Sequence, residues 1–393
     1  MKYAVLYNMV GDIVEYTISV IKHLMIYNGH EITTPDDADI LAISICDVTQ
    51  IKFVERVRKL YPGKKLLVGG HAAIYYKLFG IFADYVNLGQ GFEVFECQTI
   101  EEIENLPSVW VRGVEKPVLI PSTKIDWSIV PVANVTRKQK YYWGAVGCKN
   151  KCKFCLTSWA NPHQKNDVHR VKQVLKQYPN CTIVSNDSED VPPRMTQSIM
   201  LKDFLVRPLK KHAVYRIGVE FATETNRRRY GKPFSDDMFV QAVDRAYDEP
   251  VRLKLFCISG IDGYDDWDAL FSQLHPHYQT GNIEVKFTNI SYEMFTPIKR
   301  ERFGIDIDKM FSTERARTFV SKHKLTNFAL KALPCTSVRN CLSKNILLYT
   351  TNIDEYHMHR KIYREPEDVM LRYFKEISKD NDYSDTVKIN LRV

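Results

Sequence analysis

The chain has 393 residues, of which 45% are hydrophobic and 26% are charged, with a formal net charge of +8. This length predicts two or three domains, and the composition excludes a disordered or fibrous protein. The charge permits a nucleic-acid partner without requiring one, because such partners need clustered basic residues. The sequence has no run of eighteen apolar residues, so we expect no membrane-spanning helix and no membrane partner.

The first hundred residues alternate strand and helix patterns. Apolar runs typical of buried strands lie at residues 3–7, 40–45, 65–68 and 85–88, and helical spacing of apolar residues fills 12–28 and 50–61. Strands that alternate with helices favour a parallel sheet. We therefore expect a doubly wound, Rossmann-like α/β domain over residues 1–100. Ligands of such sheets bind at the carboxyl ends of the strands, where Gly69, Gly70, Gly89 and Gly91 would allow close approach.

Residues 101–140 are predicted to be a connector, because they contain four prolines and few periodic runs. Strand patterns resume at 141–146, 181–185, 214–221, 253–258 and 283–290, and a weaker one lies near Val206. Helical segments separate them, so a second α/β domain is expected over residues 141–300. Residues 301–393 carry a helical pattern at 365–378 and a strand pattern at 388–391, which predicts a small C-terminal α+β domain.

Three cysteines lie within eight residues, at Cys148, Cys152 and Cys155. Iron–sulfur clusters are normally held by four thiolates, so three on one loop would leave one iron of a cubane cluster open to a small molecule. A zinc site with His163 as fourth ligand is the alternative. The first seven residues predict a strand rather than a signal peptide, and nine cysteines without an export signal indicate reduced thiols. We expect a cytoplasmic protein.

The sequence around these cysteines resembles that of the radical S-adenosylmethionine enzymes. The likeness rests on Gly147 before the first cysteine, Phe154 before the last, and the apolar run at 141–146, and it extends over about residues 1–300. It implies a partial (β/α)6 barrel over 141–300, with a [4Fe-4S] cluster on the three cysteines. It also implies that S-adenosylmethionine binds the open iron and is cleaved to a 5′-deoxyadenosyl radical, with an electron from a donor such as flavodoxin or ferredoxin.

Further segments carry the same resemblance, at residues 182–187, 215–222 and 255–263. They match the family's second, fourth and fifth barrel strands, and they imply five cofactor-binding residues: Phe154, Ser185, Asp187, Glu220 and Gly260. A carboxylate at a buried strand end needs a cation or a hydrogen-bond donor. The structural alternative is therefore that Glu220 pairs with an arginine such as Arg216 or Arg252.

The N-terminal domain resembles the cobalamin-binding-type domain that precedes many such barrels, through residues 38–44, 67–72 and 83–91. The Asp-x-His-x-x-Gly motif that supplies a cobalt ligand in many cobalamin proteins is absent. His71 and His30 are the histidines near strand ends. Cobalamin is therefore a possible cofactor, and a domain that only shapes the substrate cleft is the alternative.

The resemblance implies a transferase that methylates an unactivated carbon. Methylthiotransferase-like modification of tRNA or protein is the enzymatic alternative, although only Cys46 stands where that family has three cysteines. A zinc- or nucleic-acid-binding module is the non-enzymatic one. The densest basic cluster of the chain is at residues 227–229, which we expect to form a solvated first turn of a helix rather than a nucleic-acid contact. Cys335 and Cys341 are candidates for catalysis or an auxiliary cluster, or are buried thiols. The substrate is left open between a nucleic acid, a peptide and a small metabolite.

Overall fold

The structure is a computed structural model. It describes residues 1–8, 12–46, 50–116, 118–119, 124–136, 139–150, 152, 161–185, 196–259, 261–274, 283–289, 313–323, 325 and 327–331. The described residues form two compact units, the first with residues 1–149 and 161–185, the second with residues 150, 152 and 196–331. Each unit is an α/β structure built on parallel strands, as the sequence predicts.

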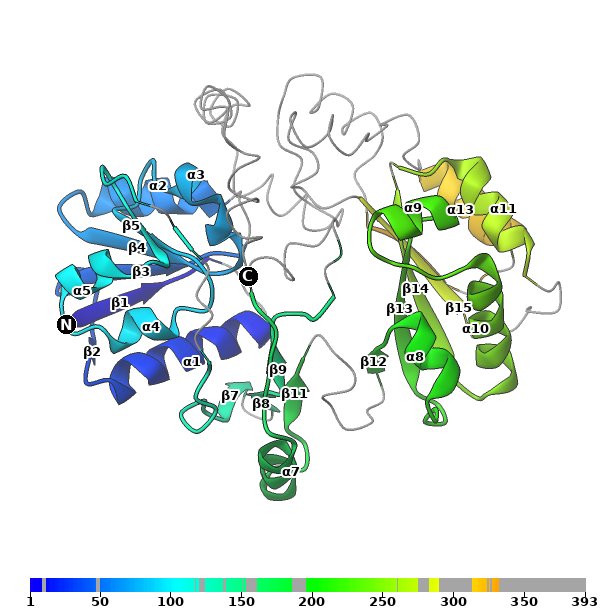
Figure 1. Cartoon of the computed structure of the whole chain (residues 1–393), viewed down its shortest axis with the longest axis horizontal. Coiled ribbons are helices and arrows are strands. Elements are labelled where there is room, and N and C mark those ends of the chain that lie inside the picture. Colours follow the sequence, from blue (N-terminus) through cyan, green and yellow to red (C-terminus); the bar gives the residue numbers. More distant parts are fainter. Residues whose placement is uncertain are drawn as a thin grey trace. The chain divides into compact units, whose positions relative to one another are not determined.

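The first unit contains a six-stranded sheet in the order β2-β1-β3-β4-β5-β6 (Figure 1). Its strands are β1 (Lys2–Leu6), β2 (Glu31–Ile32), β3 (Ile40–Ser44), β4 (Lys65–Gly69), β5 (Tyr85–Asn87) and β6 (Val109–Val111). All neighbours pair in parallel except β5 and β6, which are antiparallel. The four predicted strands are confirmed. Strand β6 lies within the expected connector and completes this sheet.

Helices cover both faces of this sheet. On one face lie α1 (Asp12–Tyr27), α4 (Phe92–Glu96) and α5 (Ile100–Asn105), and on the other α2 (Ile51–Leu60) and α3 (Tyr76–Phe79), which follows the 3-10 helix η2 (His71–Tyr75) (Figure 1). Helix α1 buries Tyr16, Val20 and Leu24 against the strands. This burial explains the helical spacing of apolar residues from which the sequence predicted the helix.

A three-stranded sheet, in the order β11-β8-β7, belongs to the same unit. Strands β8 (Gln139–Trp143) and β11 (Thr182–Val184) are parallel, and β7 (Ala133–Thr136) runs antiparallel to β8. A short antiparallel pair, β9 (Ala145–Val146) with β10 (Gln164–Lys165), precedes α7 (Val168–Gln177). The buried hydroxyl of Tyr16 in α1 donates to the carbonyl of Pro131 at 3.0 Å and accepts from the amide of Trp143 at 3.1 Å. These bonds attach the smaller sheet to helix α1.

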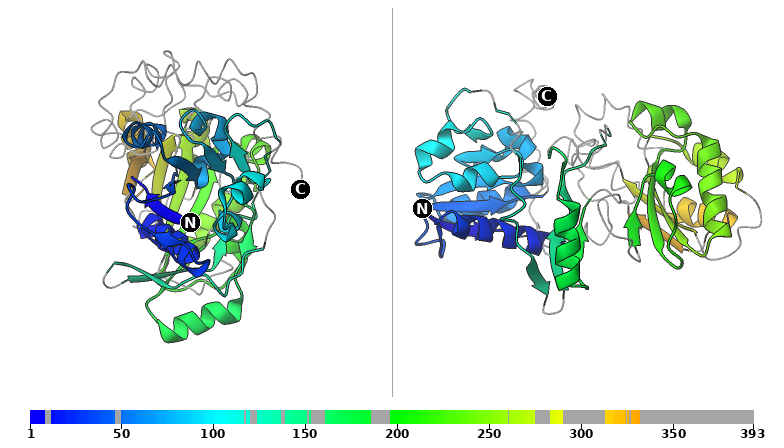
Figure 2. Two further views of the ribbon diagram at one scale, coloured as in Figure 1. Left: turned by 90° about the vertical axis from the view of Figure 1, so that its left-hand side faces the viewer. Right: turned by 60° about the horizontal axis from the view of Figure 1, so that its bottom comes forward.

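The second unit contains a parallel sheet in the order β12-β13-β14-β15-β16. Its strands are β12 (Thr196–Ser198), β13 (Val214–Glu220), β14 (Arg252–Ser259), β15 (Ile283–Asn289) and β16 (Asn327–Lys331). Four helices lie on one face of the sheet, namely α8 (Leu201–Val206), α10 (Asp236–Asp248), α11 (Tyr264–Ser272) and α13 (Thr313–Lys322) (Figures 1 and 2). They bury Phe204, Phe239, Trp267 and Phe319 against the strands in one core.

The strand predicted near Val206 is wrong, because Val206 ends helix α8 and the strand lies earlier, at β12. A short apolar run does not distinguish a strand from a buried helical turn. Here Arg245 caps the helix by donating to the carbonyls of Phe204 and Arg207. The strands expected in one barrel fall into two sheets among the described residues, so a continuous (β/α)6 barrel stays a prediction. So do the domain boundaries at 100, 140 and 300.

The patterns at 365–378 and 388–391 lie outside the described residues. Within the described part of the chain, no helix combines the length and the apolar character that crossing a membrane requires.

Candidate functional site

The two described cysteines of the motif lie in different units. Cys148 follows β9 and Gly147 in the first unit, and Cys152 is 5% exposed in the second, with its thiol 3.7 Å from the carbonyl oxygen of Gly231. Cys155 and Phe154 lie outside the described residues. Among the residues that are described, no three histidine, cysteine or carboxylate side chains are grouped to hold a metal. The three-cysteine ligand set therefore stays a prediction.

Gly147 is required by the chain that returns after the cysteine segment. Its φ is 72°, and a Cβ there would lie 2.3 Å from the carbonyl oxygen of Asn161 and 2.5 Å from that of Pro162. Both contacts are with backbone and cannot be relieved by a side-chain rotation. The glycine that the sequence analysis noted before Cys148 thus permits the segments on either side of the cysteines to cross closely.

Glu220 ends β13 with a φ of 64°, a conformation that is uncommon for a residue other than glycine. Its carboxylate lies 3.4 Å from the ammonium of Lys232. The cation partner expected for Glu220 therefore exists, but among the described contacts it is Lys232 rather than Arg216 or Arg252. Burial raises the pKa of Glu220, and the charge of Lys232 opposes that rise. A Cβ on Gly218 would lie 2.0 Å from Glu220 Oε1.

Two fully buried polar residues hold the turn that follows β13. Asp262 accepts hydrogen bonds from the amide of Ala222 at 2.8 Å, from the hydroxyl of Thr223 at 2.9 Å and from the side-chain amide of Asn226 at 2.8 Å. Arg227, in α9 (Glu224–Arg229), donates to the carbonyls of three residues, Phe221, Ala222 and Phe234. The turn between β13 and α10 is thereby fixed at its centre.

The basic cluster at residues 227–229 lies in the last turn of α9, where Arg227 is buried and Arg228 and Arg229 are exposed. Arg227 is completely buried and also pairs with Asp236. Arg228 pairs with Glu224, and the guanidinium of Arg229 lies 5.4 Å from the centre of the Tyr230 ring. The interpretation as a solvated turn is therefore wrong for Arg227, because tertiary hydrogen bonds compensate the burial of its charge.

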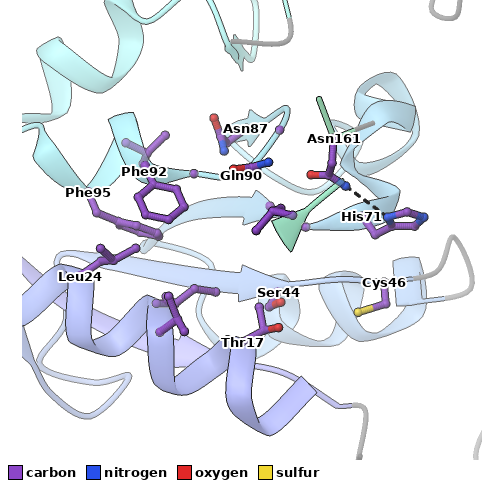
Figure 3. Close-up of a pocket in the computed structure, with 18 of the residues that line it drawn as sticks. Thr17, Leu24, Ser44, Cys46, His71, Asn87, Gln90, Phe92, Phe95 and Asn161 are labelled. Carbon is purple, nitrogen blue, oxygen red and sulfur yellow. Dashed lines mark hydrogen bonds between the residues drawn. The ribbon is translucent and has the colours of Figure 1, made fainter. Parts of the chain in front are cut away.

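The first unit contains a cavity of about 340 Å³ at the carboxyl ends of its strands. The last residues of three strands, Ser44, Gly69 and Asn87, line it together with helix α1. Figure 3 shows Leu24, Phe92 and Phe95 at one end of the cavity and Cys46, His71 and Asn161 at the other. No aspartate, glutamate, lysine or arginine is among the described residues that line it. The cavity is thus apolar at one end and polar but uncharged at the other.

The predicted site residues are distributed over both units. Ser185 lines the cavity of the first unit, and Glu220 belongs to the second. Asp187, Gly260, Cys335 and Cys341 lie outside the described residues. His71 lines the cavity, whereas His30 is buried elsewhere, with Nε2 2.9 Å from the carbonyl oxygen of Phe95. Of the two histidines near strand ends, His71 therefore reaches the cavity and His30 does not.

Gly147 and Asn161, which flank the cysteine segment, also line the cavity. The side-chain amide nitrogen of Asn161 lies 3.4 Å from Nδ1 of His71 (Figure 3). A ligand in the cavity would therefore touch the chain just before and just after the cysteines. No sequence pattern predicted Asn161 at the cavity or the pairing of Lys232 with Glu220, because these residues meet their partners only in the tertiary fold.

No family model matches the chain, and no curated protein matches it in sequence. The fold resembles that of the radical S-adenosylmethionine methyltransferase TsrM from Kitasatospora setae, solved with cobalamin and a [4Fe-4S] cluster bound. The TM-score is 0.51 at 9% identity, over 73% of this chain and 75% of that one.

It also resembles the cobalamin-dependent S-adenosylmethionine radical enzyme OxsB, solved with aqua-cobalamin and S-adenosylmethionine bound. The TM-score is 0.51 at 13% identity, over 87% of this chain and 61% of that one. The match thus spans less than two thirds of OxsB. At these identities the likeness shows a shared fold.

Proposed function

We propose that this chain is a radical S-adenosylmethionine enzyme that transfers a methyl group to an unactivated carbon, with a [4Fe-4S] cluster and cobalamin as cofactors. The observation that carries the proposal is the cavity at the strand ends, because Gly147 and Asn161 line it from both sides of the cysteine segment. The proposal includes domains at 1–100, 141–300 and 301–393, joined by a connector at 101–140. The shared fold with TsrM and OxsB supports it.

The residues present suit these cofactors. Cys148, Cys152 and Cys155 offer soft thiolates, which iron–sulfur clusters use. A cavity of about 340 Å³ lies at the lower end of the range of about 300–1,000 Å³ for small-molecule sites. When bound, these groups supply the reductive cleavage of S-adenosylmethionine and a carrier for the methyl group.

The protein's own residues would bind and orient S-adenosylmethionine. Glu220 and Lys232 present opposite charges close to Gly231, whose carbonyl contacts Cys152. We assign Glu220, with Ser185 and Asp187, to the ammonium or ribose hydroxyls of S-adenosylmethionine, and Phe154 and Gly260 to its adenine. The hydrogen bonds to Asp262 and from Arg227 keep the turn after Glu220 in place.

The test is anaerobic reconstitution of the full chain with iron and sulfide, followed by S-adenosylmethionine and dithionite, with 5′-deoxyadenosine as the measured product. We expect product from the native chain and none above background from Cys152→Ala. The matched control is Cys97→Ala, which removes another buried thiol that does not line the cavity. Equal product from Cys152→Ala and the native chain would contradict the proposal.

The alternatives have distinct readouts in the same preparation. Transfer of labelled methyl from S-adenosylmethionine supports methylation, and a methylthio product supports the methylthiotransferase-like reaction. That reaction has little support, because Cys46 is the only cysteine described at this cavity. Zinc in place of iron in the purified protein, with no 5′-deoxyadenosine, would favour the binding module.

A further inference from the structure

We propose that the cavity of the first unit binds a neutral, largely apolar small molecule whose polar group has a hydrogen-bond donor beside an acceptor. The binding site is argued from the cavity alone. The further step, that this molecule is the methyl acceptor, rests on the proposed function and selects a small metabolite over a nucleic acid or a peptide.

The polar side of this site is set by Asn87, the last residue of β5. Asn87 is 4% exposed and lines the cavity (Figure 3). Its backbone pairs with Val109 of β6, but its side-chain amide has no hydrogen-bond partner among the residues that the structure describes. By contrast, the side-chain amide of Gln90, which also lines the cavity, donates to the carbonyl of Pro162 at 3.3 Å.

The free amide of Asn87 predicts the kind of polar group that the ligand carries. An amide offers two N–H donors and one carbonyl acceptor. A buried polar group without a hydrogen bond costs free energy, and a ligand with a complementary donor and acceptor removes that cost. A carboxamide, a lactam or the edge of a nitrogen heterocycle has such a pair of neighbouring groups.

The other end of the cavity requires an apolar group. Leu24 of α1 and the rings of Phe92 and Phe95 of α4 form this end (Figure 3). Leu24 and Phe95 are almost completely buried in the core of the unit, so packing fixes their positions. A ligand with a ring or a compact hydrocarbon group would bury its apolar surface against these side chains.

Charge and size restrict the ligand further. Because the described lining has no carboxylate, ammonium or guanidinium group, an ion would lose its hydration without gaining a counter-charge. This disfavours phosphorylated molecules, nucleic acids and S-adenosylmethionine itself. The volume of about 340 Å³ suits a small metabolite. Cobalamin is much larger and would bind outside this cavity.

Asn87 has one competing role. It also lines a neighbouring cavity of about 20 Å³, together with Glu93 and Ser108. That volume is enough for about one water molecule. If Asn87 served only to hold a water there, replacing it would leave the choice of ligand in the larger cavity unchanged.

The experiment is isothermal titration calorimetry of the full chain with three naphthalene derivatives of nearly equal shape. The carboxamide has a donor and an acceptor, the methyl ketone has the acceptor alone, and the carboxylate carries a charge. We expect the carboxamide to bind about tenfold more tightly than the ketone, which corresponds to about one net hydrogen bond. The carboxylate should bind at least about a hundredfold more weakly than the carboxamide, because its charge is not compensated.

Two pairs of variants locate the bound carboxamide. Ile21→Trp places a larger side chain in the cavity and should weaken binding about tenfold or more. Its control, Ile26→Trp, changes an exposed residue of the same helix that does not line the cavity. Asn87→Leu should bind the carboxamide and the ketone equally. Its control, Asn105→Leu, alters a residue of α5 outside the lining and should keep the preference.

No binding of the carboxamide, equal binding of the carboxylate, or undiminished binding by Ile21→Trp would overturn the inference. A preference for the carboxamide that survives in Asn87→Leu would assign Asn87 to the water and overturn the class of ligand. These titrations use neither iron nor S-adenosylmethionine, so each such result leaves the radical chemistry standing. A chain that binds the carboxamide but forms no 5′-deoxyadenosine would overturn the proposed function, and with it the acceptor role, while the binding site stands.

Discussion

Two regions of the molecule differ in their charged side chains, namely the cavity of the first unit and the turns after β13 in the second. The described lining of the cavity contains no charged side chain, whereas the turns after β13 hold Glu220, Arg227, Lys232 and Asp262 partly or fully buried. A cavity that has no charged side chain and is apolar at one end favours binding of an apolar group there without desolvating ions. Buried charges need specific partners, so the second region fixes the position of its groups through a hydrogen-bond network.

The two regions also use glycine differently. At Gly70 and Gly147, the atoms that would obstruct a Cβ belong to the backbone. At Gly218 they belong to the ends of the Glu220 and Lys232 side chains, which can rotate away. Substitutions should therefore strain the backbone around the cavity, and in the second region they should disturb a charge pair while leaving the backbone in place.

The largest loss of unfolding free energy is expected when Arg227 is replaced. Arg227→Met leaves the carbonyls of Phe221, Ala222 and Phe234 without their donor and Asp236 without its cation. Loss of a buried, paired guanidinium costs about 3 kcal/mol or more of unfolding free energy. The measurement is denaturant unfolding of the full chain. The control Arg228→Met removes an exposed pair and should cost about 0.5 kcal/mol or less; equal effects would show that the buried network is not what holds this turn.

The next effect is expected at Gly70, and it tests the backbone at the cavity. Gly70→Ala combines a positive φ with a close approach to the carbonyl of Ile45, which should cost about 2–3 kcal/mol. The neighbouring Gly69→Ala is the control, because a Cβ there meets nothing within 4 Å. Thermal unfolding compares the two variants. A similar midpoint for both would remove the argument that this turn is built around glycine.

A smaller effect is expected at Gly218. A Cβ there would displace Glu220 Oε1 and Lys232 Nζ, so Gly218→Ala should cost about 1–2 kcal/mol by breaking this partly buried pair. The double variant Gly218→Ala/Glu220→Gln should lose less unfolding free energy than the two single variants lose in total, because both substitutions disrupt the same pair. Denaturant unfolding of the two single variants and the double variant measures the difference. Strict additivity would mean that the added methyl group acts on something other than the pair.

The smallest effect is expected on how the unfolding free energy varies with pH, where His71 and Glu220 should act in opposite directions. His71 has a folded pKa lowered to about 4, so its contribution to stability is present above its ordinary pKa of about 6.5 and is lost as pH falls towards 4. Glu220 has a raised pKa, so its contribution is present below its ordinary pKa and is lost as pH rises above it. Both side chains are partly exposed to solvent, which reduces the change of unfolding free energy with pH that each one causes.

Unfolding free energies of the native chain, His71→Gln and Glu220→Gln between pH 4 and 7 would separate these slopes. His71→Gln should reduce the loss of stability towards low pH, and Glu220→Gln should reduce the loss towards high pH. A variant whose profile parallels that of the native chain would show that its side chain does not titrate as described.

The sequence predicted most strands because their patterns are local. The apolar runs at 40–45 and 65–68 became β3 and β4, and the glycines beside them became turns at the cavity. The strand predicted near Val206 is wrong for an equally local reason, because three or four apolar residues suit a helical turn as well as a strand. Strand β16 was not predicted, because its apolar run at 328–330 is too short to distinguish a strand from a helical turn, and only its pairing with β15 defines it.

The sequence by itself determined the cysteine spacing, the parallel α/β class and the glycine positions at strand ends, because each depends on residues close together in the chain. Only the tertiary structure decided that Lys232 rather than an arginine meets Glu220, that Arg227 is buried, and that Asn161 contacts His71 across ninety positions. Such partners are selected by the folded geometry, in which a buried charge or imidazole takes whichever suitable group the packing brings within reach.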